Sequence, residues 1–120
     1  MKLAVLVAAL SMSASLAAAQ TRGQRAASPT TPPEKVAEAY NQFLLGHRLE
    51  DKDDEAGAAA AYKRAMELDP MAADIPAELA SVYLRQNKVQ EAMSAAEAAL
   101  KIAPANREAN RVLGTVYAAL

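Results

Sequence analysis

The chain has no cysteine, no tryptophan and a single histidine, and aromatic residues make up only 4% of its 120 residues. Without cysteine it forms neither a disulfide framework nor a thiolate metal site. No second histidine can join His47, so we expect His47 to be an ordinary, partly exposed residue and predict no metal ion and no cofactor. The sequence contains no glycine-rich phosphate loop, nucleophile elbow or paired catalytic residues, so no catalytic residue is predicted.

No single sign of charge dominates the chain. Its 13 Lys and Arg residues are balanced by 14 Asp and Glu residues, and both kinds are mixed along the sequence. Nucleic-acid-binding modules concentrate basic residues on one face, so no nucleic-acid partner is expected. Apolar residues amount to 52%, and alanine, which favours helices, is the commonest of them.

Residues 1–19 have the pattern of a secretory signal peptide. Lys2 precedes the apolar run Leu3–Leu10, and Ala17-Ala18-Ala19 offers small residues for cleavage before Gln20. We therefore predict an exported protein, periplasmic or secreted, with no membrane span after cleavage. The alternative is an uncleaved anchor, although Leu3–Ala19 is at the lower limit of length for a span.

Residues 20–33 are rich in Ser, Thr and Pro and contain no apolar residue larger than alanine, which predicts a flexible linker. Thr31 and Glu34 are expected to form a capping box at the start of the first helix. The region 34–120 shows helical periodicity and short polar breaks, which predicts an all-α fold. The expected helices are Pro33–Glu50, Glu55–Leu68, Asp74–Gln86, Val89–Ile102 and Asn106 to the end, with the acidic run before Glu55 capping the second.

The helical region repeats with a period of 34 residues. The pattern occurs three times in register, as Leu45-Gly46-x-x-Leu49, Leu79-Ala80-x-x-Tyr83 and Leu113-Gly114-x-x-Tyr117. At the same period, Ala58 corresponds to Ala92 and Pro70 to Pro104. This period and these residues resemble the tetratricopeptide repeat, a helix–turn–helix unit. The resemblance implies an α-solenoid of antiparallel helix pairs with units at about 39–70 and 73–104 and an incomplete unit at 107–120.

Some positions depart from the family pattern. Gln42, Pro76 and Asn110 stand where the family has a large aromatic residue, and Ala96 stands in the second unit where the first has Tyr62. Thinner packing and a less stable array are expected to follow. Gly46 and Ala80 are expected at close helix contacts that do not tolerate bulk.

In the family the first helix of each unit lines a concave groove that binds a protein or peptide. The resemblance implies that this face carries Tyr40, Phe43, His47, Asp74, Ala77, Ser81, Arg85, Glu108, Arg111 and Thr115. As a groove residue, Ala77 should tolerate larger side chains. Tyr40 and Phe43 either anchor a ligand or pack internally. One branch of the family clamps carboxylate ends with Lys, Asn and Arg on this face, but those places here hold Phe43, His47, Glu78, Glu108 and Val112.

The sequence thus favours a non-catalytic protein-binding or peptide-binding scaffold of the cell envelope or the secreted space. One alternative is the N-terminal module of a longer envelope enzyme whose catalytic part lies beyond residue 120. Another is a self-assembly module that associates through the open C-terminal repeat, because the third unit stops within its first helix and repeat arrays need a covering end.

The first prediction is that export removes residues 1–19. N-terminal sequencing of the exported protein should begin at Gln20, and replacing Ala19 with Arg should block processing because the peptidase requires a small residue there. An exported protein that begins at Met1 would contradict this prediction.

Overall fold

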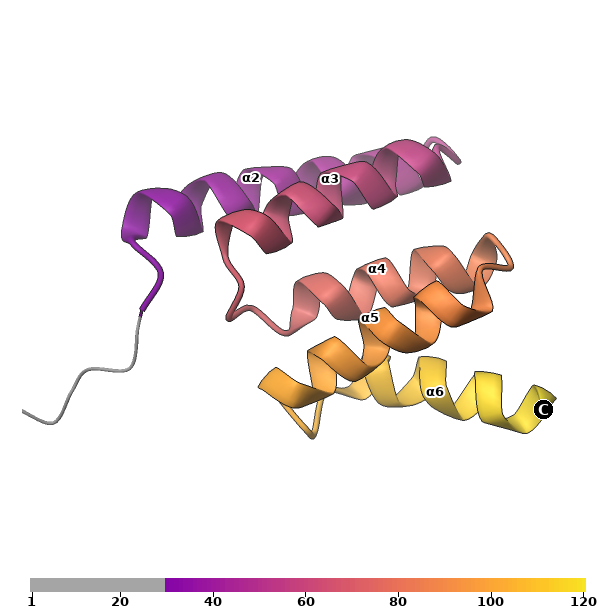
Figure 1. Ribbon diagram of the computed structural model, residues 1–120. Helices are drawn as coiled ribbons and strands as arrows, with labels where there is room; N and C mark the ends of the chain where they lie inside the picture. Colours follow the sequence, from indigo (N-terminus) through magenta and orange to yellow (C-terminus); the bar gives the residue numbers. More distant parts are fainter. Residues whose placement is uncertain (1–29) are drawn as a thin grey trace, which may run out of the picture.

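The computed structural model describes residues 30–120, which form five helices (Figure 1). The helices are α2 (Pro33–Glu50), α3 (Glu55–Leu68), α4 (Asp74–Arg85), α5 (Val89–Ile102) and α6 (Arg107–Ala119). These bounds match the predicted ones within one residue. The predicted signal peptide, residues 1–19, and residues 20–29 of the predicted linker lie outside the described residues.

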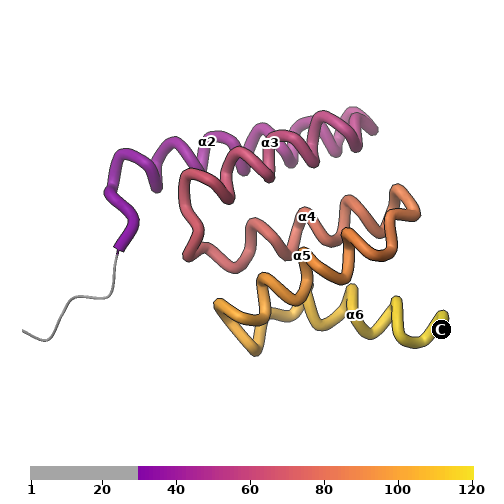
Figure 2. The backbone as a smooth tube through the Cα atoms, in the orientation of Figure 1, coloured from indigo at the N-terminus to yellow at the C-terminus, as the bar shows by residue number. Residues whose placement is uncertain are grey.

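The helices form antiparallel pairs that stack on one another (Figures 1 and 2). α2 pairs with α3 and α4 with α5, and α6 follows as the first helix of a third unit. α4 is central because it contacts α5 within its own pair, α3 of the preceding pair and the following α6. The all-α, tetratricopeptide-like architecture is thereby confirmed. Within residues 30–120 no helix is both long and apolar enough to span a membrane.

The same tight turn closes both complete helix pairs. Asp53 and Asn87, 34 residues apart, have φ angles of 59° and 62°, in the left-handed region that Asp and Asn tolerate better than most residues. In each turn the N–H of the next residue donates to a carbonyl five residues earlier, at 2.9 Å. The 34-residue period therefore extends to the backbone conformation of the turns.

Two helices begin with a side-chain cap. The Asp54 carboxylate accepts a hydrogen bond from the Gly57 N–H at 2.9 Å, which confirms that the acidic run caps α3. The Asn106 side chain accepts from the Ala109 N–H at 3.0 Å at the start of α6. Each cap satisfies a backbone donor that has no partner inside its helix.

The predicted capping box at the start of α2 is wrong. Pro32 is the N-cap residue, and no side chain caps this helix end. The Thr31 hydroxyl instead donates to the Asp69 carboxylate at 2.9 Å, across 38 residues. A hydroxyl that donates to a charged carboxylate forms a strong hydrogen bond, and only the folded helix pair brings Asp69 within reach of Thr31.

Alanine forms most of the core. Its largest fully buried side chains are Tyr62, Val82 and Val112. Small side chains at the helix contacts let the backbones approach closely, so the array packs with few large residues. Seven alanines have no exposed surface: Ala58, Ala65, Ala80, Ala92, Ala96, Ala99 and Ala109.

The expectation that Ala77 is a tolerant groove residue is wrong, because its side chain is only 1% exposed. α4 is enclosed by α3, α5 and α6, and buried residues lie nearly all around it. A side chain as short as alanine is covered by its longer neighbours on such a helix. Bulk at Ala77 should therefore overpack the core in the same way as bulk at Ala80.

Gly46 and Gly114 hold the same repeat position but have different surroundings. A Cβ atom on Gly46 would lie 2.7 Å from Cδ1 and Cζ of the Tyr62 ring. A Cβ atom on Gly114 would meet nothing within 4 Å. The difference arises because α3 covers Gly46, whereas no described helix covers the corresponding side of α6.

This contrast gives a matched pair of substitutions. Gly46→Ala should lower the free energy of unfolding by about 1–3 kcal/mol, because the ring of buried Tyr62 must move. Gly114→Ala should raise it by about 0.5–1 kcal/mol, because alanine favours the helix and meets no obstacle. Chemical denaturation of both variants measures the two changes, and equal effects at the two glycines would contradict the assigned packing.

Candidate binding groove

Polar side chains from all three units meet on the face formed by the first helix of each unit. The groups come from α2, α4 and α6, with one from the start of α3, and we call them the groove network. Its members are His47, Glu50, Glu55, Glu78, Ser81, Arg85, Glu108 and Arg111.

Glu50 connects the core to the groove. Its side chain is only 16% exposed, and its Oε2 atom accepts a short hydrogen bond from the hydroxyl of fully buried Tyr62. Its Oε1 atom forms an ion pair with Arg85 of the next unit. The Nδ1 atom of His47 lies 3.3 Å from Oε2. Burial, and then the hydrogen bond to Glu50, raise the pKa of the Tyr62 hydroxyl well above its usual value, so it stays a donor.

Arg85 and Arg111 meet at a shared serine. Ser81 is buried, and its Oγ atom accepts hydrogen bonds from Arg85 at 3.3 Å and from Arg111 at 3.1 Å. Arg85 also donates to Glu55, at 3.0 Å. Although burial lowers it, the hydrogen bonds to Glu55 and Glu50 raise the pKa of Arg85 above its usual value. Both guanidinium groups are therefore fixed in orientation while about half of each side chain stays exposed.

Glu108 completes the pairing at the third unit. Arg111 donates to Glu108 through Nε at 3.0 Å and through a second nitrogen at 2.5 Å. These hydrogen bonds hold the pKa of Glu108 below its usual value, against the opposing effect of burial. The pair lies within the first turns of α6, where a negative charge also benefits from the helix dipole.

Glu78 is the exception in this network. Its side chain is half-buried, and none of the hydrogen bonds or ion pairs found within residues 30–120 involves its carboxylate. Burial raises the pKa of Glu78, and the carboxylates of Glu108, Glu50 and Asp74 raise it further, whereas His47 lowers it. Glu78 thus lies near three other carboxylates and has no direct cationic partner in the described part of the chain.

The ten groove residues predicted from the sequence fall into distinct environments. Five belong to the groove network: His47, Ser81, Arg85, Glu108 and Arg111. Tyr40, Phe43 and Asp74 line a hollow of about 160 Å³ at the start of α4. Ala77 is buried, and the Thr115 hydroxyl donates to the Arg111 carbonyl of its own helix, so neither joins the network.

The two aromatic residues of the predicted groove face differ in role. The Phe43 ring lies 4.6 Å from the His47 ring and 5.6 Å from the Tyr62 ring, between centroids, and it packs against the core. Tyr40 is 60% exposed. Phe43 therefore supports His47 from behind, and Tyr40 is the aromatic side chain available to a ligand.

The sequence did not place Glu50 or Glu55 on the groove face, and it named Glu78 there only as a departure from the family's carboxylate clamp. Glu50 follows His47 by three residues, which puts both on one helix face, and this spacing could have indicated it. Glu55 meets Arg85 across 30 residues, and Glu78 approaches His47 from another helix. Contacts of that kind carry no local signal in the sequence.

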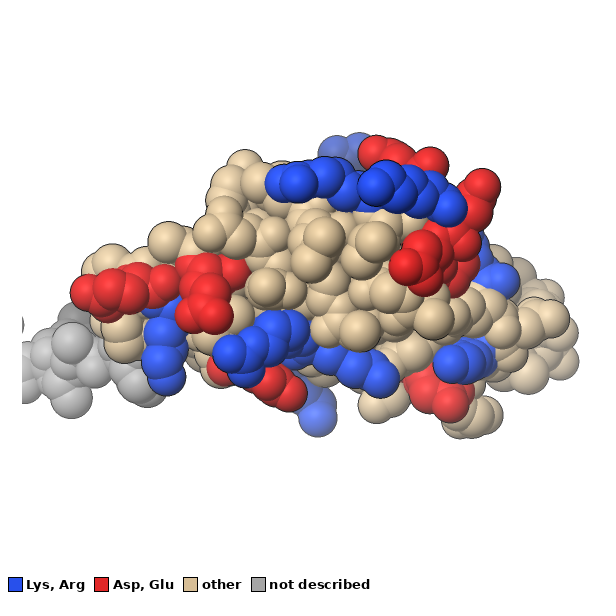
Figure 3. Space-filling view, turned by 90° about the horizontal axis from the view of Figure 1, so that it is seen from above, with Lys and Arg blue, Asp and Glu red and all other residues tan. Residues whose placement is uncertain are grey.

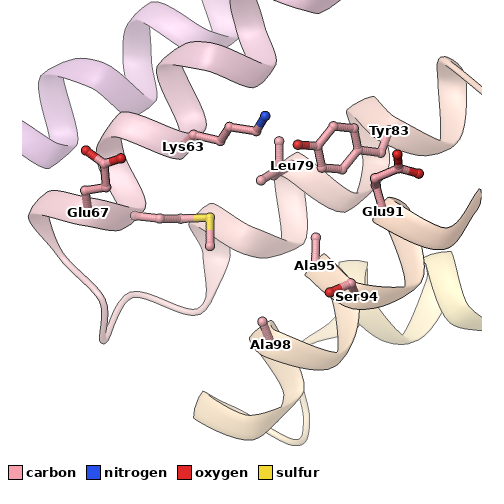
Figure 4. Close-up of a pocket in the computed structure, with 9 residues that line it drawn as sticks. Lys63, Glu67, Leu79, Tyr83, Glu91, Ser94, Ala95 and Ala98 are labelled. Atoms are coloured by element: carbon pink, nitrogen blue, oxygen red, sulfur yellow. The ribbon is translucent and has the colours of Figure 1, made fainter. Parts of the chain in front are cut away.

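A second hollow lies among α3, α4 and α5 (Figure 4). The volume of this hollow is about 580 Å³, and Leu79 and Tyr83 of α4 line it. The short side chains Ser94, Ala95 and Ala98 of α5 leave this space unfilled. Lys63 reaches across it, with Nζ 5.6 Å from the centre of the Tyr83 ring.

Charges of both signs are interspersed on the face shown in Figure 3.

The position of Glu78 generates a pH-dependent prediction. Because its pKa is raised in the folded state, the stability that its proton provides is complete below the ordinary carboxyl pKa and is lost as the pH rises through the raised value. Glu78→Gln should therefore raise the melting temperature at about pH 7 in a metal-chelating buffer, and this gain should vanish near about pH 4. Exposed Glu97→Gln is the control and should leave the melting temperature unchanged at both pH values. A gain in E78Q that does not depend on pH would contradict the raised pKa of Glu78.

Comparison with known proteins agrees with this architecture. The family model described as tetratricopeptide repeat matches residues 43–107 and 78–120. The BBSome complex member bbs-4 of Caenorhabditis elegans is 32% identical over 84 residues, which are 70% of this chain but only 18% of that protein.

Solved structures show the same fold. The Arabidopsis OM64 TPR domain superposes with a TM-score of 0.66 at 20% identity, covering 68% of each chain. The N-terminal domain of stress-induced protein-1 (STI-1) from C. elegans gives 0.66 at 22% identity, covering 72% of this chain and 74% of that one. MamA gives 0.65 at 27% identity, covering 68% and 47%. With a family model that matches more than half of its residues, the chain belongs to the tetratricopeptide repeat family.

Proposed function

We propose that the protein is a non-catalytic scaffold that binds a protein or peptide along the groove network. The observation that carries this proposal is the convergence of oriented, half-exposed polar side chains from three successive units on one face. Membership of a repeat family that generally mediates protein interactions supports it, and so does the description of bbs-4 as a member of a complex. An extended face of this kind suits a segment that lies across several units.

The charge of the groove indicates the chemistry of the ligand. The groove network holds four carboxylates, those of Glu50, Glu55, Glu78 and Glu108, against two guanidinium groups, which leaves an excess of two negative charges. Both arginines already pair with these carboxylates. Electrostatic complementarity therefore favours a segment rich in Lys or Arg over an acidic one.

We also propose that the protein is exported and works in the cell envelope or the secreted space. The support is the pattern of residues 1–19, with Lys2, the apolar run and the alanines before Gln20. The alternative of a module within a longer envelope enzyme assigns the same binding role to residues 30–120. It would add chemistry supplied by a further domain.

A second candidate function, self-association, is favoured by one face of α6. Tyr117 is 55% exposed, Leu113 is only partly buried and Gly114 borders open space. Covering such an apolar face with a second copy of the chain lowers the free energy, which favours association. Sedimentation over a series of concentrations should then show mass rising with concentration, and Tyr117→Glu should abolish the rise. A constant monomer mass would reject this candidate.

Selection from a random peptide library, with the full chain as target and a chelator present, tests the groove proposal. The selected peptides should carry a net positive charge, because the groove has an excess of carboxylates. Glu78→Gln should weaken the binding of a selected peptide by roughly twofold to fivefold, the usual scale for one charge contact at a partly exposed site.

The matched control is Glu97→Gln on α5, which changes the net charge equally but lies outside the groove network. Backbone amide shifts on titration should map to α2, α4 and α6. Acidic selected peptides, or shifts confined to residues of the α3–α5 hollow, would refute the proposal.

A further inference from the structure

One histidine and two carboxylates converge in the groove. One ligand atom from each of His47, Glu50 and Glu78 lies within 4.8 Å of the other two. The first two residues are three apart on α2, and the third comes from α4 of the next unit. The sequence analysis predicted no metal ion at His47, and it could not bring Glu78 to this site because that residue is 31 positions away along the chain.

Other residues hold two of these donors in place. The His47 ring makes edge-on contacts with Phe43, at 4.6 Å and 88°, and with Tyr62, at 5.6 Å and 79°. The Glu50 carboxylate is fixed by the Tyr62 hydroxyl on one oxygen and by Arg85 on the other. Supporting contacts of this kind orient metal ligands in proteins and strengthen metal binding.

The local excess of negative charge also favours the binding of a cation. The carboxylates of Glu50, Glu55 and Glu78 outnumber the single Arg85 guanidinium by two, which equals the charge of a divalent ion. The existing ion pairs engage Glu50 and Glu55, so of these three carboxylates Glu78 is the one for which residues 30–120 show no hydrogen bond or ion pair.

We propose that His47, Glu50 and Glu78 bind one divalent transition-metal ion of the Zn²⁺ type. An imidazole nitrogen with carboxylate oxygens is a ligand set that zinc accepts, whereas Ca²⁺ and Mg²⁺ prefer oxygen ligands alone. Three protein ligands leave a further coordination position open to water or to a donor group on a segment bound in the groove. Because the ligands come from α2 and α4, the metal would join the first two units across the groove face.

The single histidine makes the test specific. Titration of the full, tag-free chain with ZnCl₂ by calorimetry should show one Zn²⁺ bound per chain. The only side-chain imidazole resonances in the NMR spectrum belong to His47, and they should move in step with the heat. Zinc should also raise the melting temperature, because it binds the folded array and links two of its units.

Glu78→Gln and His47→Asn should each weaken zinc binding by roughly tenfold or more, because each removes one ligand. Exposed Glu97→Gln should bind zinc as tightly as the natural chain does. Melting curves in chelator show whether each variant is folded. If H47N does not fold, E78Q still tests the site, because glutamine keeps the shape of the glutamate side chain. Absence of zinc binding, unchanged affinity in E78Q, or zinc binding that leaves the His47 resonances unmoved would overturn the proposal.

Discussion

The contact between the buried Tyr62 hydroxyl and the Glu50 carboxylate is the interaction on which the groove depends. Tyr62 fills the space beneath Gly46, and its ring leaves no room there for a side chain. Its hydroxyl must find an acceptor inside the protein, because a buried donor without a partner costs about 1–3 kcal/mol. Glu50 is that acceptor, and the contact holds its carboxylate at the edge of the core.

A chain of side-chain contacts runs from Glu50 into the second and third units. Glu50 holds Arg85, Arg85 and Arg111 share Ser81, and Arg111 holds Glu108. Each of these contacts is partly exposed, and an exposed ion pair alone stabilises a protein by only about 0–1 kcal/mol. Their main effect is therefore to orient the charges that a ligand meets, while the alanine-rich helix contacts beneath them supply most of the stability.

Much of the fold follows from local patterns in the sequence. Proline, polar breaks and helical periodicity predicted all five helices, and the 34-residue period predicted their pairing, because these signals act within one unit. Thr31 was assigned to the wrong partner because Asp69 becomes its neighbour only after α2 and α3 pair. Ala77 was assigned to the wrong environment because its burial depends on three helices that enclose α4. The contacts of the groove carboxylates Glu55 and Glu78 were missed for the same reason, since their neighbours lie about one unit away in sequence.

A double-mutant cycle between Glu50 and Tyr62 tests the central claim most directly. The account predicts that Glu50→Leu lowers the free energy of unfolding by about 1–3 kcal/mol, because it leaves the buried Tyr62 hydroxyl without an acceptor. Adding Tyr62→Phe should restore much of that loss, because the unpaired hydroxyl is then gone. Chemical denaturation of the two single variants and the double variant measures the coupling. Losses that simply add would show that the groove does not depend on this contact.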